Sequence, residues 1–245
     1  MTDFFDRYDR NPNKAELRKT TYEYFNDKYI ENPFQNYWII EQTERFKAKG
    51  LKFFMPGRVY TYQYMPEGAD VLDFYDKRPM VYIIGEYVSK STGKRIVQGV
   101  NLNFLPESVK AKFIDTAFRI FGDAYKKADE MSDEDRLVSM MQINNLVTNW
   151  YFMSLNFDKN AKIGLSFAVR NYEIKRIMNP VLIEVEDFEM IPYFVPKEMM
   201  GLPIGGIYAL YLKNRIELLQ NSERRNKDAN RALQAQKKFK KPGGS

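Results

Sequence analysis

The chain contains neither histidine nor cysteine among its 245 residues. These two side chains supply most nucleophilic dyads, most zinc sites and nearly all proton transfer near neutral pH. Disulfide bonds are excluded, and few enzyme classes remain. One is a Mg²⁺-dependent nucleic-acid enzyme, for which the candidate ligands are Asp70, Asp73, Asp76 and Glu86. Acids of this kind flank turns in many β proteins, so we expect no enzyme activity, no cofactor and no metal.

Long apolar runs are also absent. No stretch approaches the roughly 18 consecutive apolar residues that a transmembrane helix requires. The first 14 residues carry charges where a signal peptide needs an apolar region. Because 44% of the residues are hydrophobic and 15% are aromatic, the chain can nevertheless bury a sizeable core. We expect a soluble protein, made in the cytoplasm, with one folded body and appendages.

Positive charge is concentrated at the C-terminus. Residues 213–245 contain ten Lys or Arg and three acids, a net charge of +7, whereas the whole chain carries +6. The remaining residues therefore sum to about −1. A basic tail of this kind binds DNA phosphates, binds an acidic protein, or is merely solvated. The candidate DNA-binding residues are Arg224, Arg225, Lys227, Arg231, Lys237, Lys238, Lys240 and Lys241.

Residues 56–106 show the pattern of three β-strands separated by proline, glycine and aspartate. Tyr60, Tyr62 and Tyr64 alternate with other residues at the period of two that is typical of a half-buried strand. Residues 80–84 form a short apolar run with β-branched side chains. The spacing predicts a small, strongly curled antiparallel sheet or barrel.

Helical patterns occur on both sides of these strands. Residues 14–30 and 36–49 are predicted to be helices that wrap the sheet. A further helix is predicted after Pro106, which suits a first helical turn. Its apolar face is expected to include Val109 and Phe113, with Lys110 on another face.

The second half of the chain is predicted to contain a helix at 133–154 and a short helix near 161–173. Two apolar runs, at 181–185 and 188–195, resemble a hairpin or strands added to the sheet, with prolines that restrict the second run to an edge. Glycines at 201, 205 and 206 indicate a loop, and the chain becomes helical from Ile207. Beyond residue 220 we expect a lone, solvated basic helix.

These patterns predict an α+β fold, a small curled antiparallel β-barrel or sheet wrapped by helices, with a C-terminal basic helical extension. The expected divisions are an N-terminal helical wrap (1–55), a core domain of barrel and helices (56–219) and the extension (220–245).

Four motifs follow one another along the chain. Their residues are Pro56, Gly57, Val59, Tyr60, Tyr62 and Tyr64; Tyr75, Asp76, Pro79 and Val81; Gly99, Asn101, Leu102, Phe104, Leu105 and Pro106; and Ile191, Pro192, Val195, Pro196 and Gly201. In this order the motifs resemble a family of virion proteins of T4-like tailed phages, the DNA end protectors. The chain departs from the pattern by an insertion-like segment at 89–95 and by Phe188 where a tryptophan is expected. Most motif residues are expected to be structural, with Asp76 capping a turn.

The resemblance implies a virion protein at the capsid vertex, neck or tail, made in the host cytoplasm, that contacts packaged double-stranded DNA or neighbouring subunits. We expect it to be oligomeric in the particle, with other virion proteins as partners and no membrane. The main alternative is a tail or baseplate assembly protein without DNA contact, which would use residues 188–195 and the Met199-Met200 pair to bind sister subunits.

Overall fold

The structure is a computed structural model. It describes residues 12–31, 54, 56–69, 72, 75–115, 168–203, 205–210, 212, 213, 216 and 220. The chain divides into two compact units, one made of Met1–Met65 and Asp76–Ile204, the other of Pro66–Tyr75 and Gly205–Ser245. The predicted helices at 36–49 and 133–154 and the basic extension lie outside the described residues. The three-part domain division stays a prediction.

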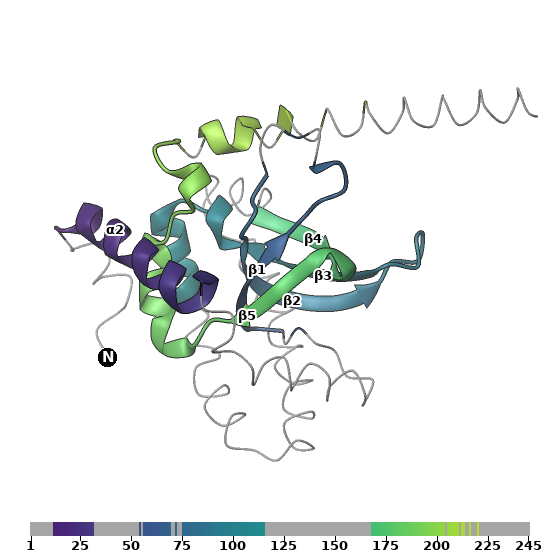
Figure 1. Ribbon diagram of the computed structural model, residues 1–245, viewed down its shortest axis with the longest axis horizontal. Helices are drawn as coiled ribbons and strands as arrows, with labels where there is room; N and C mark the ends of the chain where they lie inside the picture. Colours follow the sequence, from purple (N-terminus) through teal and green to yellow (C-terminus); the bar gives the residue numbers. More distant parts are fainter. Residues whose placement is uncertain are drawn as a thin grey trace, which may run out of the picture. The chain divides into compact units, whose positions relative to one another are not determined.

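The first unit contains a five-stranded sheet in which every pair of neighbours is antiparallel (Figure 1). The strands are β1 (Val59–Tyr64), β2 (Met80–Val88), β3 (Arg95–Asn101), β4 (Val169–Glu173) and β5 (Ile177–Leu182), and their order in the sheet is β4-β3-β2-β1-β5. The three strands predicted between residues 56 and 106 are confirmed, as is the α+β class.

The sheet is strongly curled, because its two edge strands are consecutive in the chain. β4 and β5 are joined only by η5 (Ile174–Arg176), a single 3₁₀ turn. In a flat sheet these strands would lie four spacings apart, about 19 Å, whereas three residues of 3₁₀ helix rise only about 6 Å. No ladder pairs β4 with β5 in this described region. Over the described residues the sheet is therefore open, and the closed barrel that the sequence also allowed is not confirmed.

Tyrosine side chains fill the concave face of the curl. Tyr62 and Tyr64 of β1 meet the ring of Tyr172 of β4 edge-on, with centroids 5.4 and 4.9 Å apart, although β2 and β3 separate these strands in the sheet. The period-two tyrosines of β1 thus belong to the core, as predicted. The cluster around them consists of Phe54, Tyr60, Tyr62, Val81, Ile83, Val97 and Tyr172.

Helices pack beside the sheet within the same unit. α2 (Lys14–Phe25) continues into the π-helical turn η1 (Asn26–Glu31), which confirms the helix predicted at 14–30. Residues 107–115 are also helical. The guanidinium of Arg18 binds the Glu107 carboxylate through two hydrogen bonds of 2.6 and 2.8 Å. This pair links α2 to the helix that follows β3.

Lys110 is not on the exposed face that the sequence predicts. It is only 2% exposed, and its amine donates a hydrogen bond of 2.8 Å to the Phe194 carbonyl. The buried residues of 107–115 are Lys110, Ala111, Phe113, Ile114 and Asp115, and Phe113 meets the ring of Tyr82 on β2. Phe113 is buried as predicted, but the placement of Lys110 was wrong, because a long aliphatic side chain can be buried when its amine finds an acceptor.

The predicted hairpin at 181–195 was wrong. The first run contributes only Val181 and Leu182 to β5, a strand added to the sheet beside β1 as the other alternative expected, and Val185–Tyr193 forms the 3₁₀ helix η6. Phe188, Ile191 and Phe194 are buried and recur every three residues, which is the period of a 3₁₀ helix.

Two smaller expectations also failed. Residues 169–173, predicted as the end of a short helix, form β4 and pair with β3. Gly205 and Gly206 begin a helix at 205–210 instead of extending the loop at Gly201.

Candidate nucleic-acid interface

A basic hairpin joins β2 and β3 at one end of the sheet. The Ser89 amide donates to the Lys94 carbonyl, and the Gly93 amide donates to the Ser89 carbonyl, both at 2.8 Å. Gly93 has a φ of 67°, in the left-handed region that glycine adopts without steric cost. The insertion-like segment is therefore a defined turn, and it presents Lys90 to solvent.

Glu173, the last residue of β4, brings three cations together beside this hairpin. Its carboxylate binds Lys94 at 3.1 Å, Lys175 at 2.9 Å and Arg176 at 3.1 Å. The hydrogen bond from Lys175 and those from the other two cations lower the pKa of Glu173 to about 2, against a smaller opposing effect of burial. The carboxylate therefore stays ionised and holds the hairpin against the β4–β5 turn.

A second carboxylate organises the opposite side of the hairpin. Glu86 of β2 is buried, and Arg95 of β3 donates hydrogen bonds to its Oε1 from both Nε, at 3.1 Å, and a terminal nitrogen. This pair fixes the Arg95 side chain while half of its surface stays in contact with solvent.

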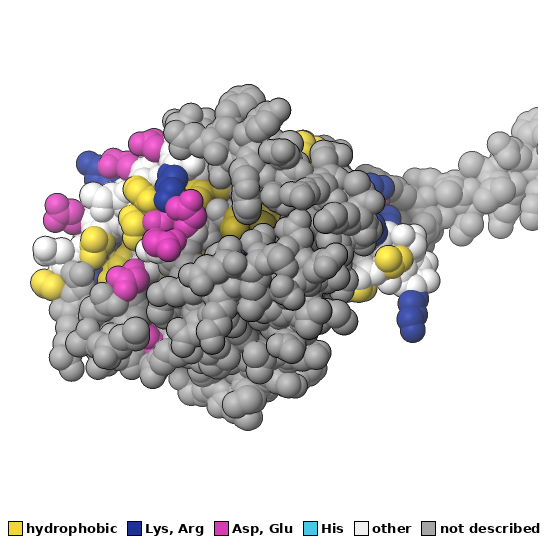
Figure 2. Space-filling model, turned by 90° about the horizontal axis from the view of Figure 1, so that it is seen from below, with side chains coloured by type: hydrophobic (Ala, Val, Ile, Leu, Met, Phe, Trp, Pro, Cys, Tyr) yellow, Lys and Arg dark blue, Asp and Glu magenta, His cyan; other side chains and the backbone are white. Residues whose placement is uncertain are grey.

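Residues 86–95 and 173–176 together carry five cations and two carboxylates, a net charge of +3. We refer to Lys90, Lys94, Arg95, Lys175 and Arg176 as the hairpin surface. Residues 184–189 of the same unit contain four acids and no cation. In the space-filling view, acids gather at the left together with some Lys and Arg side chains, and further Lys and Arg side chains lie at the right (Figure 2). The hairpin surface is thus a positive region on a body of nearly neutral net charge.

Two motif residues, Asp76 and Asn101, belong to a polar network at the other end of β3. Asp76 Oδ2 accepts hydrogen bonds from the side-chain amides of Asn101 at 2.8 Å and Asn103 at 2.9 Å, and Asp76 Oδ1 accepts one from the Arg78 amide at 3.1 Å. The Asn101 amide also donates to the Tyr172 hydroxyl at 3.0 Å. The predicted turn cap is confirmed, and Asp76 in addition joins the segment before β2 to the end of β3.

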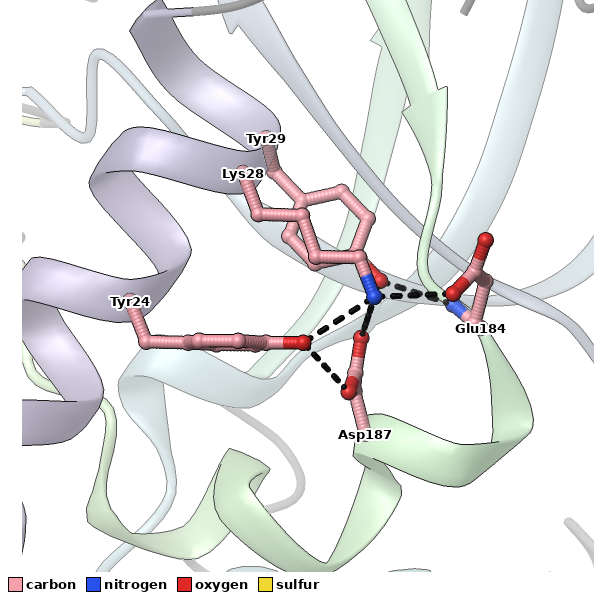
Figure 3. A network of polar contacts seen from close by, with 5 residues as sticks. All are labelled: Tyr24, Lys28, Tyr29, Glu184 and Asp187. Atoms are coloured by element: carbon pink, nitrogen blue, oxygen red, sulfur yellow. Dashed lines mark hydrogen bonds and ion pairs between the residues drawn. The ribbon is translucent and has the colours of Figure 1, made fainter. Parts of the chain in front are cut away.

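A third polar cluster joins η1 to η6. The Lys28 amine donates to Asp187, Glu184 and the Tyr24 hydroxyl, at 2.8, 2.8 and 3.0 Å (Figure 3). Tyr24 and Tyr29 donate their hydroxyls to the two oxygens of Asp187. Burial disfavours the charged amine, but these hydrogen bonds outweigh it and raise the pKa of Lys28. Each of the five residues bonds to at least one other member, so the cluster ties the α2–η1 segment to η6.

Of the four residues singled out as Mg²⁺ ligands, the structure describes only Asp76 and Glu86. Asp76 and Glu86 are engaged in the separate networks above, and Asp70 and Asp73 lie outside the described residues. Over the described ranges, no group of three acids is placed to hold a metal ion, and no helix there is long and apolar enough to cross a membrane.

All eight predicted DNA-binding residues, from Arg224 to Lys241, lie outside the described residues, and their role stays a prediction.

Comparison with known proteins decides the family. Residues 15–142, just over half of the chain, match the family described as Phage T4 terminal DNA protecting protein. The chain belongs to this bacteriophage family. No curated protein and no solved structure matches it.

The matched segment of this DNA-protecting family runs from α2 to beyond the helix at 107–115 and includes β1, β2, β3 and the basic hairpin. Asp76, Asn101 and Asn103 all lie within it. The family consists of structural DNA-protecting proteins and not of enzymes, which confirms the expectation from composition.

The hairpin surface was missed at the level of sequence. Its cations are divided between two segments about 80 residues apart, and neither segment alone is as basic as the C-terminal tail. The available signal was the insertion-like SKSTGKR segment, which contains three cations and no acid.

Proposed function

We propose that this chain is a virion protein that binds the ends of packaged double-stranded DNA and shields them from exonucleases. The observation that carries this proposal is the match to the phage T4 terminal DNA protecting family over residues 15–142. We further propose that the protein lies at the capsid vertex, neck or tail, beside other virion proteins.

The charge distribution supports this role. Phosphate neutralisation requires Lys and Arg but no base-reading side chains, and both the hairpin surface with its two carboxylates and residues 213–245 carry a net positive charge. We propose that Arg224, Arg225, Lys227, Arg231, Lys237, Lys238, Lys240 and Lys241 bind phosphates along the duplex.

End protection can be tested directly. A linear duplex would be incubated with the protein and then treated with an exonuclease that degrades from duplex ends. We expect degradation to slow in proportion to occupancy, while an endonuclease cuts an internal site of the same duplex at its normal rate. Equal exonuclease rates with and without saturating protein would refute the proposal.

The contribution of the tail is tested by replacing its eight candidate cations with glutamine in the full chain. The slope of log affinity against log salt should become less negative by about 0.9 for each phosphate that the tail no longer neutralises. Replacing Lys19 and Lys197, two exposed lysines of the helical segments, provides a control for loss of charge alone. An unchanged slope would show that the tail does not bind DNA.

The alternative is an assembly protein without DNA contact, which would bind sister subunits through residues 188–195 and the Met199-Met200 pair. Most of these residues are buried. Phe188 and Ile191 are buried in η6, and Met199 is 1% exposed. Only Met200 of the expected apolar pair is exposed.

A further inference from the structure

An exposed aromatic side chain lies next to the hairpin surface. Tyr87 of β2 is 43% exposed. It pairs with Ile96 of β3, which in turn pairs with Glu173 of β4. These three residues therefore form one row across a single face of the sheet, and the backbone of Tyr87 lies two strand spacings, about 10 Å, from that of Glu173, whose carboxylate binds three cations.

The Tyr87 ring has no aromatic partner among the described residues. The other tyrosines of the sheet, at positions 60, 62, 64, 82 and 172, all pack against another ring. An exposed ring at the edge of a basic surface is a feature of proteins that bind nucleic acids, because bases stack on aromatic rings and phosphates bind the cations.

The cations beside Tyr87 are held in place yet remain accessible. Glu173 positions Lys94 and Lys175, whose side chains are 37% and 68% exposed. A phosphate can therefore share these ammonium groups without displacing the carboxylate. The net charge of +3 remains after both carboxylates are counted, so the surface attracts a polyanion.

We propose that the hairpin surface contacts DNA phosphates next to a duplex end and that Tyr87 stacks on the exposed face of the terminal base pair. This inference rests on the proposed function and assigns it a site on the folded body, separate from the C-terminal tail. Phosphates occur along the whole duplex, whereas an unstacked base-pair face occurs only at an end. A protein that prefers ends needs a group that binds this face, and an exposed aromatic ring meets that need.

The test compares two DNA ligands of equal length, a blunt-ended duplex and the same duplex closed at both ends by covalent hairpin loops. Affinities of the full chain would be measured for both by fluorescence anisotropy. Tyr87→Ala should lower the preference for the open duplex by roughly fivefold or more, the effect of losing one stacked base. Tyr87→Phe should retain it, because the ring is kept. Met200→Ala, at a similarly exposed apolar residue, is the matched control.

The cations are tested by Lys90→Ala combined with Lys175→Ala. If both lysines contact phosphate, the slope of log affinity against log salt should become less negative by about 1.8, for open and closed duplexes alike. Lys19→Ala combined with Lys197→Ala removes the same charge from the helical segments. Thermal unfolding of each variant would verify that the fold is retained.

The outcomes separate this site from the proposed function. If the unaltered chain prefers open ends but Tyr87→Ala keeps the same preference, Tyr87 does not bind the end and the inference fails while the function stands. The inference also fails if the Lys90 and Lys175 variant shows the same salt slope as its control. If the unaltered chain binds open and closed duplexes equally, both proposals are overturned.

Discussion

Lys110 offers the most direct test of how this body is stabilised. Its side chain is 2% exposed, and its amine bonds to the Phe194 carbonyl. Burial lowers the pKa of Lys110 from 10.5 to about 8, and the nearby Glu107 and Asp76 carboxylates oppose the shift only partly. Folding therefore favours release of the proton from this amine.

The sign of the pH dependence follows from proton counts. Between pH 8 and 10.5 the unfolded chain keeps the Lys110 proton and the folded chain loses it, so the free energy of unfolding rises with pH. For a pKa of about 8 in the folded state, the gain from pH 7 to pH 9.5 is about 2 kcal/mol. The range stops at pH 9.5 because buried Tyr62 and Tyr172, whose pKa values are raised by burial, cause the opposite trend at higher pH.

The assay is urea unfolding of the unaltered chain and of Lys110→Met at several pH values from 7 to 9.5. Subtracting the two curves removes the contributions of the other titrating groups. The difference should grow by about 2 kcal/mol in favour of the unaltered chain as pH rises. Lys112→Met, on the exposed side of the same helix, is the control. A difference that stays constant with pH would show that Lys110 titrates normally and would refute the reasoning.

Three further substitutions test the networks that hold the sheet and helices together. Asp76→Ala leaves two asparagine side chains without their shared acceptor and should lower the free energy of unfolding by about 1–3 kcal/mol; an unchanged urea midpoint would contradict this. Gly99→Ala would place a methyl group 2.5 Å from the Tyr82 carbonyl oxygen, at a cost of about 1–3 kcal/mol in the same assay, and a variant of normal stability would show that the strands can move apart. Lys28→Met removes the cation that binds Asp187 and should lower the melting temperature, less so in high salt, whereas an equal loss at all salt concentrations would argue against an ionic contribution.

Local patterns in the sequence were sufficient to predict the three strands between residues 56 and 106. The alternating tyrosines from Tyr60 to Tyr64 predicted β1, and the apolar run starting at Met80 predicted β2, because strand periodicity depends only on which face is buried. η6 could have been predicted from the spacing of Phe188 and Ile191. The two prolines in the segment favoured an edge strand instead, although the same residues fit a 3₁₀ helix equally well.

The sequence by itself determined the α+β class, the absence of histidine and cysteine chemistry, the three strands of residues 56–106 and, through the motifs, the phage family. Tertiary structure decided which polar residues meet. Asp76 binds side chains 25 and 27 residues away, Lys110 bonds to a carbonyl 84 residues away, and Lys94, just before β3, binds Glu173 on the neighbouring strand β4. The pairing of distant segments depends on how strands curl and helices pack, and neither periodicity nor composition encodes these partners, so the hairpin surface became visible only in the folded chain.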